Sequence, residues 1–414
     1  MPSDHQHTDQ HSTAAHGPRY GRRRLFSLAG GLGVGVAALG FGADLAAGSP
    51  VRHKIAATAT GTATPAVAAP PITVVSSQAG VAEGDLFFTD MGSSPSLEVA
   101  DPAGAQLWTQ TGAASYADFR VQSYRGQPVL TWWESASTGL AAYAEGRDVV
   151  TDLDHTVLAT VEKRGDYAPD EHEFLITSSG TALITSYVKR AHDLSAHGGS
   201  ADGFVVTGVL EEIDLASGQV LMRWDALDHI ALAESYAGVP EDSAEPWDFF
   251  HINSVTPTAD GNLLVSARHT WALYKISART GAVIWRLGGK RSDFVVPEDA
   301  TFAWQHNAVF QDDGALRLFD NGSDGTTVVH PASSVLWLQV DQDQRTVKLR
   351  RRLTHPEQVS ASAMGNAQLL ANGNVLVGWG SAKRMSELSP SGELLFDATL
   401  AEVSYRAYRH PFTA

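Results

Sequence analysis

The chain contains 414 residues, of which 43% are hydrophobic and 18% are charged, so it is long enough to bury a sizeable core. Its formal net charge of −16 argues against a general nucleic-acid binder, because such binding relies on clustered Lys and Arg. The same charge repels anions at long range, so any anion-binding site must be locally basic. The chain has no cysteine, which excludes disulfides, thiolate metal sites and a cysteine nucleophile.

The N-terminal residues carry the pattern of an export signal. Residues 1–20 are polar, and a Gly- and Ala-rich apolar run follows the sequence GRRRLF at residues 21–26 and ends near Ala47. Paired arginines before a mildly apolar run resemble a twin-arginine signal. We therefore expect residues 1–47 to direct export through the twin-arginine translocase, or to stay as a membrane anchor if they are not cleaved. The protein would then be secreted, in the cell envelope or held at the membrane.

Residues 48–71 have the composition of a linker. They are rich in Ala, Thr, Pro and Gly and show no core-forming pattern. Signal cleavage after small residues fits both the sequence AAG at 46–48 and the sequence ATA at 57–59, and the choice stays open. The folded domain should begin near Ile72 and extend over residues 72–414.

A two-part pattern recurs along this domain. Its first half is a Gly-centred turn before a short β run, at Gly84–Phe88, Gly126–Trp132, Gly180–Ile184, Gly261–Val265, Gly314–Phe319 and Gly373–Val377. Its second half is another Gly turn before apolar residues and often Trp, at residues 103–108, 217–224, 280–285 and 391–396, with weaker copies at 154–160 and 344–353. Turn-bounded strands at a period of roughly 40 to 60 residues are typical of propeller blades. The sequence therefore predicts an all-β fold, a six-bladed β-propeller after the export segment; the alternative is a β-sandwich of unrelated hairpins.

A propeller brings residues that are distant in sequence to one place. The innermost strands line a central channel, so residues at equivalent positions of successive blades meet at its mouth. Isolated histidines in different blades can therefore form one site. Residues 190–204 and 229–246 interrupt the spacing, and we expect them to be loop insertions at the rim.

Four side chains at the edges of β runs are candidates for chemistry: His172, His251, Arg268 and His306. A neutral imidazole can act as a nucleophile, and histidine exchanges protons near neutral pH. A channel-facing arginine needs an anionic partner, which a ligand can supply. The alternatives are structural or hydrogen-bonding histidines, a solvated acidic loop around His172, and a surface salt bridge for Arg268. Alternation along the strand sends Arg268 and His269 to opposite faces, so only one of them should face the channel.

Familiar metal and cofactor motifs are absent. The sequence has no His-Glu-x-x-His, EF-hand loop, P-loop, Gly-x-Ser-x-Gly elbow or dinucleotide fingerprint between a strand and a helix. Several histidines and carboxylates could still hold zinc. We nevertheless expect no required metal and no cofactor.

At these residues the chain resembles the bacterial and fungal arylsulfotransferases that do not use a nucleotide sulfate donor. The resemblance extends from about Leu86 to Phe412 and rests on FHINS (250–254), SARH (266–269), IWRLGG (284–289), QH (305–306), MGNAQ (364–368) and GWG (378–380). It implies a six-bladed propeller with its site at the central channel. Better-studied members carry a disulfide, which this chain cannot form.

The resemblance also implies roles for single residues. His306 would accept the sulfuryl group from an aryl sulfate and pass it to a phenol, which gives ping-pong kinetics. His251 and Arg268 would bind the sulfuryl oxygens, and His172 would be the remaining catalytic histidine, which moves the proton. The residues expected to contact the small-molecule substrates are Trp247, Phe250, Trp304, Asn253 and Asn307, with Phe249 as a further apolar wall.

Two other functions stay open on the sequence. The first is a non-catalytic propeller that keeps the channel residues to bind an anionic ligand or a cell-surface partner. The second, more distant, is a quinone-dependent dehydrogenase, although the vicinal cysteines often found under that cofactor are absent. Release of phenol from a chromogenic aryl sulfate, with and without an acceptor phenol, separates a transferase, a sulfatase and a binding protein.

Overall fold

The computed structural model describes residues 70–135, 145–242 and 244–411. The chain divides into two units, residues 1–65 and 66–414, and all described residues belong to the second. The export segment and nearly all of the predicted linker therefore lie outside the described residues. Within the described ranges, no helix has the length and apolar character needed to cross a membrane.

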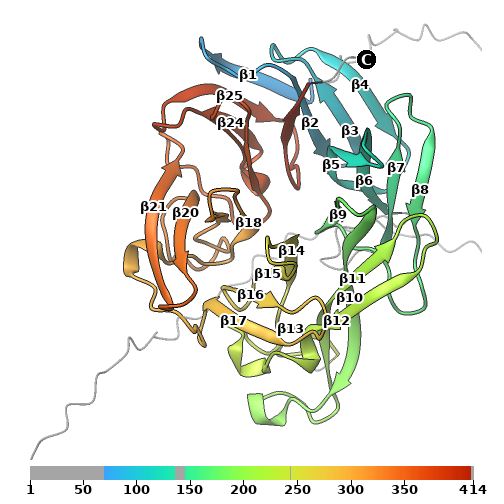
Figure 1. Cartoon of the computed structure of the whole chain (residues 1–414), viewed down its shortest axis with the longest axis vertical. Coiled ribbons are helices and arrows are strands. Elements are labelled where there is room, and N and C mark those ends of the chain that lie inside the picture. Colours follow the sequence, from blue (N-terminus) through green and yellow to red (C-terminus); the bar gives the residue numbers. More distant parts are fainter. Residues whose placement is uncertain (1–69, 136–144, 243, 412–414) are drawn as a thin grey trace, which may run out of the picture. The chain divides into compact units, whose positions relative to one another are not determined.

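The described residues form six sheets arranged around a central axis, which confirms the predicted six-bladed β-propeller (Figure 1). Neighbouring strands are antiparallel, except that the short strand β13 (Trp247–Asp248) runs parallel to β11. From the axis outwards, the first sheet contains β26 (Tyr408–His410), β2 (Asp85–Asp90), β3 (Ser96–Ala100) and β4 (Gln106–Thr111). The second contains β5 (Ser115–Tyr124), β6 (Gln127–Ser135), β7 (Gly146–Thr151) and β8 (Val157–Val161). The third contains β9 (Phe174–Ile176), β10 (Thr181–His192), β11 (Gly203–Asp214) and β12 (Val220–Asp225). The fourth contains β14 (Ile252–Pro257), β15 (Leu263–Ala267), β16 (Ala272–Ile276) and β17 (Val283–Gly288). The fifth contains β18 (His306–Phe310), β19 (Ala315–Asp320), β20 (Ser334–Asp341) and β21 (Thr346–Thr354). The sixth contains β22 (Asn366–Leu369), β23 (Val375–Gly378), β24 (Arg384–Leu388), β25 (Leu394–Leu400) and β1 (Ile72–Ser77). Short 3₁₀ helices in the connections are η1 (Ser195–His197), η2 (Ala226–Asp228), η3 (Leu232–Glu234), η4 (Glu298–Ala300) and η5 (Gly380–Ala382).

Both halves of the sequence repeat correspond to fixed places in a blade. Each Gly turn of the first half precedes the second strand of a sheet, and each turn of the second half joins the third strand to the fourth. The second strands are buried on both faces, as in β15, where Leu263 and Val265 pack towards the third sheet and Leu264 packs towards the fifth. Continuous apolar runs replace alternation here because a blade lies between two other blades.

The recurring Gly and Trp connect neighbouring blades. The indole N–H of Trp224 on β12 donates to Gly281 O at 2.9 Å, in the turn before β17 of the next blade. Gly281 has φ +72, and a Cβ there would lie 3.2 Å from Trp224 Cδ1, so glycine suits both the turn and the close approach. Trp285 repeats the arrangement and donates to Gln342 Oε1 at 3.1 Å.

Segments from both ends of the described domain close the ring. β26 pairs with β2 through Tyr408↔Phe87, and β1 pairs with β25 through Ile72↔Leu400. Figure 1 shows the result: β1 (blue) lies along β25 (red), and this sheet stands beside β2 of the first sheet. The first blade is therefore incomplete until the C-terminal segment has been added.

The inner strands have no neighbouring strand on the side of the axis, and side chains satisfy part of their backbone instead. An asparagine near the start of three inner strands binds the main chain of the next blade. The contacts join Asn253 Nδ2 to Gln305 O (2.6 Å), Ala367 N to Asn307 Oδ1 (3.1 Å) and Asn366 Nδ2 to Ala407 O (2.9 Å).

The two expected insertions differ from each other. β10 and β11 pair without interruption out to His192↔Gly203, so the loop prediction for residues 190–204 was wrong at both of its ends. The ladder hydrogen bonds continue there because the hairpin itself is lengthened, and η1 lies at its tip. The described residues of 229–246, by contrast, are irregular apart from η3, and the N–H of Tyr236 donates to His269 O at 2.7 Å.

Candidate active site

The antiparallel order of each blade brings the candidate residues to one mouth of the propeller. The start of an inner strand lies at the same end of a blade as the turn after the second strand. His251 directly precedes β14, and Arg268 directly follows β15. In the next blade His306 is the first residue of β18, and Asn321 directly follows β19. His172 precedes the inner strand β9 in the same way.

Hydrogen bonds determine which nitrogen of His306 carries the proton. The amide group of Asn321 donates to the carbonyls of Ala361 (2.9 Å) and Met364 (3.0 Å), so its Oδ1 is the acceptor that faces His306. His306 Nδ1 lies 2.7 Å from this Oδ1 and 3.0 Å from Trp304 O, and both atoms accept hydrogen bonds. Nδ1 must therefore carry the hydrogen, which leaves the lone pair of the neutral ring on Nε2.

Arg268 and His269 meet at the same site, so the expectation that they face opposite ways is wrong. Arg268 Nη1 lies 2.8 Å from His269 Nε2, and Arg268 Nη2 donates to Ser362 O at 3.1 Å. Strand alternation does not apply because β15 ends at Ala267, and the two residues belong to the turn that follows it. Among the described residues, no carboxylate forms an ion pair with Arg268.

Two carboxylates orient the other histidines. Asp170 Oδ1 accepts a hydrogen bond from His172 Nδ1 at 2.5 Å, and Asp248 Oδ2 accepts one from His251 Nδ1. The His172 and His251 rings lie at right angles, with their centroids 4.9 Å apart. Because each Nδ1 is bound to a carboxylate, the Nε2 atoms are the ones available to a substrate.

The surroundings move the pKa values of the histidines in different directions. Burial lowers the pKa of His306 well below its ordinary value, and the nearby Arg268 charge lowers it further. Burial likewise lowers the pKa of His251, with contributions from His172 and Arg268. Burial also opposes the charged form of His172, but the charge and hydrogen bond of Asp170 outweigh it and raise its pKa. The site therefore combines neutral imidazoles with one histidine that holds a proton more readily.

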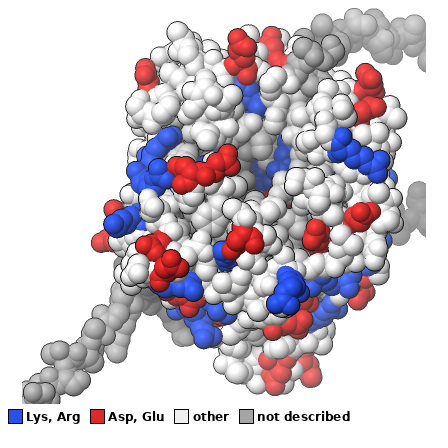
Figure 2. Space-filling model, viewed as in Figure 1, with Lys and Arg blue, Asp and Glu red and all other residues white. Residues whose placement is uncertain are grey.

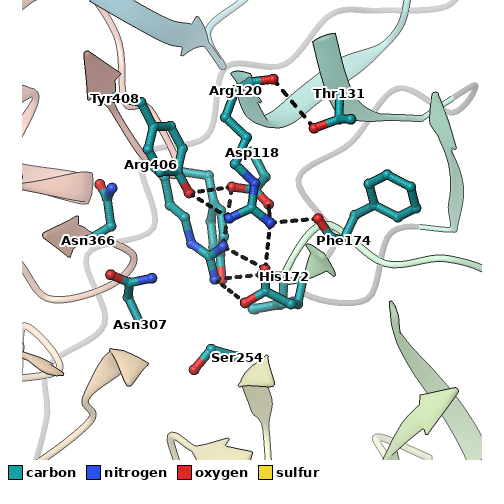
Figure 3. Close-up of polar contacts among 12 residues, drawn as sticks. Asp118, Arg120, Thr131, His172, Phe174, Ser254, Asn307, Asn366, Arg406 and Tyr408 are labelled. Carbon is teal, nitrogen blue, oxygen red and sulfur yellow. Dashed lines mark hydrogen bonds and ion pairs between the residues drawn. The ribbon is translucent and has the colours of Figure 1, made fainter. Parts of the chain in front are cut away.

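An ion network at the axis supports the loop of His172 from behind. Arg406 is 1% exposed and pairs with Asp118 and Glu173 at 3.2 and 3.0 Å, while its Nη2 donates to His172 O at 2.9 Å (Figure 3). Arg120 pairs with the same two carboxylates, at 3.1 and 2.8 Å. The network therefore joins two guanidinium groups to two carboxylates and fixes the position of the loop. Figure 2 shows Lys or Arg atoms inside a central hollow, with acidic side chains around it, although the chain is acidic as a whole.

The residues expected to contact substrate lie in two different environments. Phe250 is fully buried, and Trp247 is 4% exposed; both belong to the hydrophobic core between the third and fourth sheets. Trp304 is also buried, at 6% exposed, but it ends an aromatic row: its ring lies 4.5 Å from that of Trp271, which stacks on Tyr236 at 3.8 Å. Direct contact of these side chains with substrate stays a prediction.

The two asparagines expected to bind substrate also serve the ring. Asn253 binds the next blade through Nδ2, and its buried Oδ1 has no hydrogen-bond partner among the described residues. Asn307 Oδ1 accepts a hydrogen bond from Ala367 N, and Figure 3 shows the Asn307 side chain between those of Asn366 and Ser254. Their part in binding substrate likewise stays a prediction.

Several residues around the site adopt left-handed backbone conformations. His251 has φ 55, Trp271 has φ 49, Trp304 has φ 52 and Asn307 has φ 50. A bulky residue in this region costs about 1–2 kcal/mol, so the surrounding structure must stabilise it. Such strain is concentrated at functional sites in proteins, where it directs side chains that a relaxed backbone would point elsewhere.

One group of side chains has the make-up of a metal site. Ligand atoms of Asp248, His251 and His269 all lie within 4.8 Å of one another. Each Nδ1 already has an acceptor, because His251 donates to the Asp248 carboxylate and His269 lies 2.6 Å from Asp248 O. The Arg268 guanidinium beside this group would repel a second cation. The arrangement is therefore better suited to hydrogen bonding than to holding a metal ion.

Sequence reasoning missed the residues that orient the site. Asp170 lies two residues before His172, and Asp248 lies three residues before His251, so a carboxylate shortly before a histidine was the available signal. Asn321 gave no such signal, because it is 15 residues from His306 and reaches it only through the pairing of β18 with β19.

The fold and the site together define a β-propeller whose central site contains a half-buried arginine and several histidines, groups that suit an anion. A comparison with protein-family profiles matches residues 120–401 to the arylsulfotransferase (ASST) family. This chain belongs to that family, which confirms the resemblance found in its sequence.

The other comparisons add little about function. No curated protein matches the chain. Among solved structures, a protein of unknown function from Bacteroides caccae is 10% identical with a TM-score of 0.48, covering 79% of this chain and 98% of that chain. A virginiamycin B lyase from Staphylococcus aureus is 10% identical with a TM-score of 0.38, covering 78% of this chain and 87% of that chain. Likenesses at this level carry no argument about activity.

Proposed function

We propose that this protein transfers a sulfuryl group from an aryl sulfate to a phenol in two steps, through a sulfated His306. The observation that carries the proposal is the fixed tautomer of His306, whose lone pair is on Nε2, near Arg268, which forms no ion pair within the described residues. Membership of the arylsulfotransferase family supports the general activity, and the geometry supports these particular roles.

In the first step, His306 Nε2 forms a bond to sulfur while the bond from sulfur to the aryl oxygen breaks. The phenolate leaves and takes a proton from His172, whose pKa is raised by Asp170. The sulfated ring carries positive charge on its Nδ1–H side, which donates to Asn321 Oδ1 and Trp304 O. Arg268 and His251 bind the sulfuryl oxygens as negative charge spreads over them.

The second step reverses the first with a new partner. A phenol gives its proton to His172, and its oxygen bonds to sulfur as the bond between sulfur and nitrogen breaks. Neutral His306 and protonated His172 are thereby restored, so no cofactor or external proton source is consumed.

The test is to trap the intermediate. The protein is incubated with 4-nitrophenyl sulfate without an acceptor, digested and analysed by mass spectrometry. The added sulfuryl mass should map to the peptide that contains His306, and phenol should remove it. His306→Asn should lose the label and several orders of magnitude of turnover, whereas the exposed control His155→Asn should keep both.

Other outcomes would give other conclusions. Label on His251 or His172, together with turnover by His306→Asn, would overturn the assignment of the nucleophile. Release of phenol at the same rate with and without an acceptor would indicate a sulfatase. Binding of the aryl sulfate without any release would indicate a non-catalytic propeller.

A further inference from the structure

Arg268 has a histidine as a hydrogen-bond partner, and this fixes the state of that histidine. A guanidinium can only donate hydrogen bonds, so His269 Nε2, 2.8 Å from Arg268 Nη1, must be the acceptor. His269 Nδ1 lies 2.6 Å from Asp248 O, which can only accept. Both ring nitrogens are thereby assigned, and His269 is a neutral ring that connects the main chain of Asp248 to Arg268.

A neutral acceptor differs from a carboxylate because it leaves the positive charge of Arg268 for a ligand to bind. A carboxylate at this position would orient Arg268 equally well but would also neutralise its charge. His269 and the carbonyl of Ser362, at 3.1 Å, hold the two terminal nitrogens without neutralising them. Among the described residues, no carboxylate forms an ion pair with Arg268, and the charges of Asp248 and Asp324 act on it only from a greater distance, so its remaining N–H groups are available to an anion.

We propose that His269 is a positioning residue, which orients the Arg268 guanidinium towards the sulfuryl group and, because it accepts without being negative, places no further negative charge beside it. The inference deepens the proposed function and rests on it for the identity of the anion. His269 itself does not touch the reacting atoms in this scheme; it acts through Arg268. It also connects two oxyanion-binding groups, because Asp248 binds His269 through its main chain and His251 through its carboxylate.

Three substitutions separate this role from simple packing. His269→Gln keeps a neutral acceptor. His269→Glu introduces a side chain of nearly the same shape as Gln, which also accepts hydrogen bonds but carries a negative charge. His269→Leu fills much of the space and offers no acceptor. Each is made in the His306→Asn background, and binding of 4-nitrophenyl sulfate is measured by calorimetry, so the readout does not depend on turnover. Melting temperatures identify any variant that fails to fold.

The Gln variant should bind within about threefold of its parent, and the Leu and Glu variants should each bind about tenfold or more weakly. Equal binding by Gln and Glu, or parental binding by Leu, would overturn the proposal. Equal loss in all three folded variants would also overturn it and indicate a packing role. Sulfation of His306 in the otherwise unchanged protein is measured separately, so failure of the proposed function appears there and not in the binding series.

Discussion

Replacing Arg268 with lysine tests the site most directly, because it keeps the charge and changes the donors. Two of the five guanidinium N–H groups are engaged by His269 and Ser362, which leaves three for the sulfuryl oxygens. A lysine that keeps both contacts has one donor left. Losing two hydrogen bonds between charged groups, at about 1.5–3 kcal/mol each, costs about 3–6 kcal/mol in the transition state.

This free energy corresponds to a loss of about a hundredfold to ten-thousandfold in kcat/KM. The assay is release of 4-nitrophenol from 4-nitrophenyl sulfate at saturating phenol, with the melting temperature as a check on folding. Arg291→Lys is the control, because its side chain is 63% exposed and its ion pair with Glu234 spans 3.8 Å. An Arg268→Lys enzyme within tenfold of the parent would refute the reasoning, since Arg268 would then act only as a charge or lie outside the site.

Four further outcomes are expected. For a donor with a poorly acidic phenol, turnover should fall as the pH rises through the raised pKa of His172, because this histidine must hold its proton. On the acid side, turnover should fall only well below the ordinary pKa of histidine, because His306 must be neutral. In a pH–rate profile, His172→Ala should abolish the alkaline limb. Arg406→Met should lower the free energy of unfolding in urea by about 3–5 kcal/mol, because it strips a buried partner from Asp118 and Glu173, whereas Arg350→Met, at an exposed pair, should cost under about 1 kcal/mol. A protein that starts at Pro70 should keep one cooperative thermal transition, and a loss of cooperativity would contradict the linker interpretation. Dialysis against EDTA should leave turnover unchanged, and lost activity that zinc restores would show that a metal is required.

Much of the fold could be predicted because the repeat is local. Each Gly turn, with the apolar run after it, predicts one hairpin, and the six copies of this pattern were enough to count the blades. The closure of the ring was not predictable in this way. β1 and β26 lack the repeat pattern, and each pairs with a strand more than 300 residues away in sequence. Long-range pairing of this kind leaves no periodic signal in the residues themselves.

The site was predictable as a set of residue types and not as a geometry. The sequence pointed to His172, His251, Arg268 and His306, and the structure brings them to one mouth. The expectation that Arg268 and His269 face opposite ways was wrong, because strand alternation was extended past the last strand residue, Ala267. The hydrogen bonds that set tautomers depend on side chains from neighbouring strands and blades, which spacing alone cannot supply.

The ion network at the axis also helps to determine how many blades the ring has. Asp118 of the second blade meets Arg406 across 288 residues of sequence, and Glu173 meets it across 233. A ring with one blade missing or added would place these buried charges away from their partners, at a cost of several kcal/mol. The same contacts set the loop of His172. A wrongly closed ring would therefore be unstable and would also leave the loop of His172 out of place. The same side chains thus determine both the correct assembly of the ring and the geometry of the site.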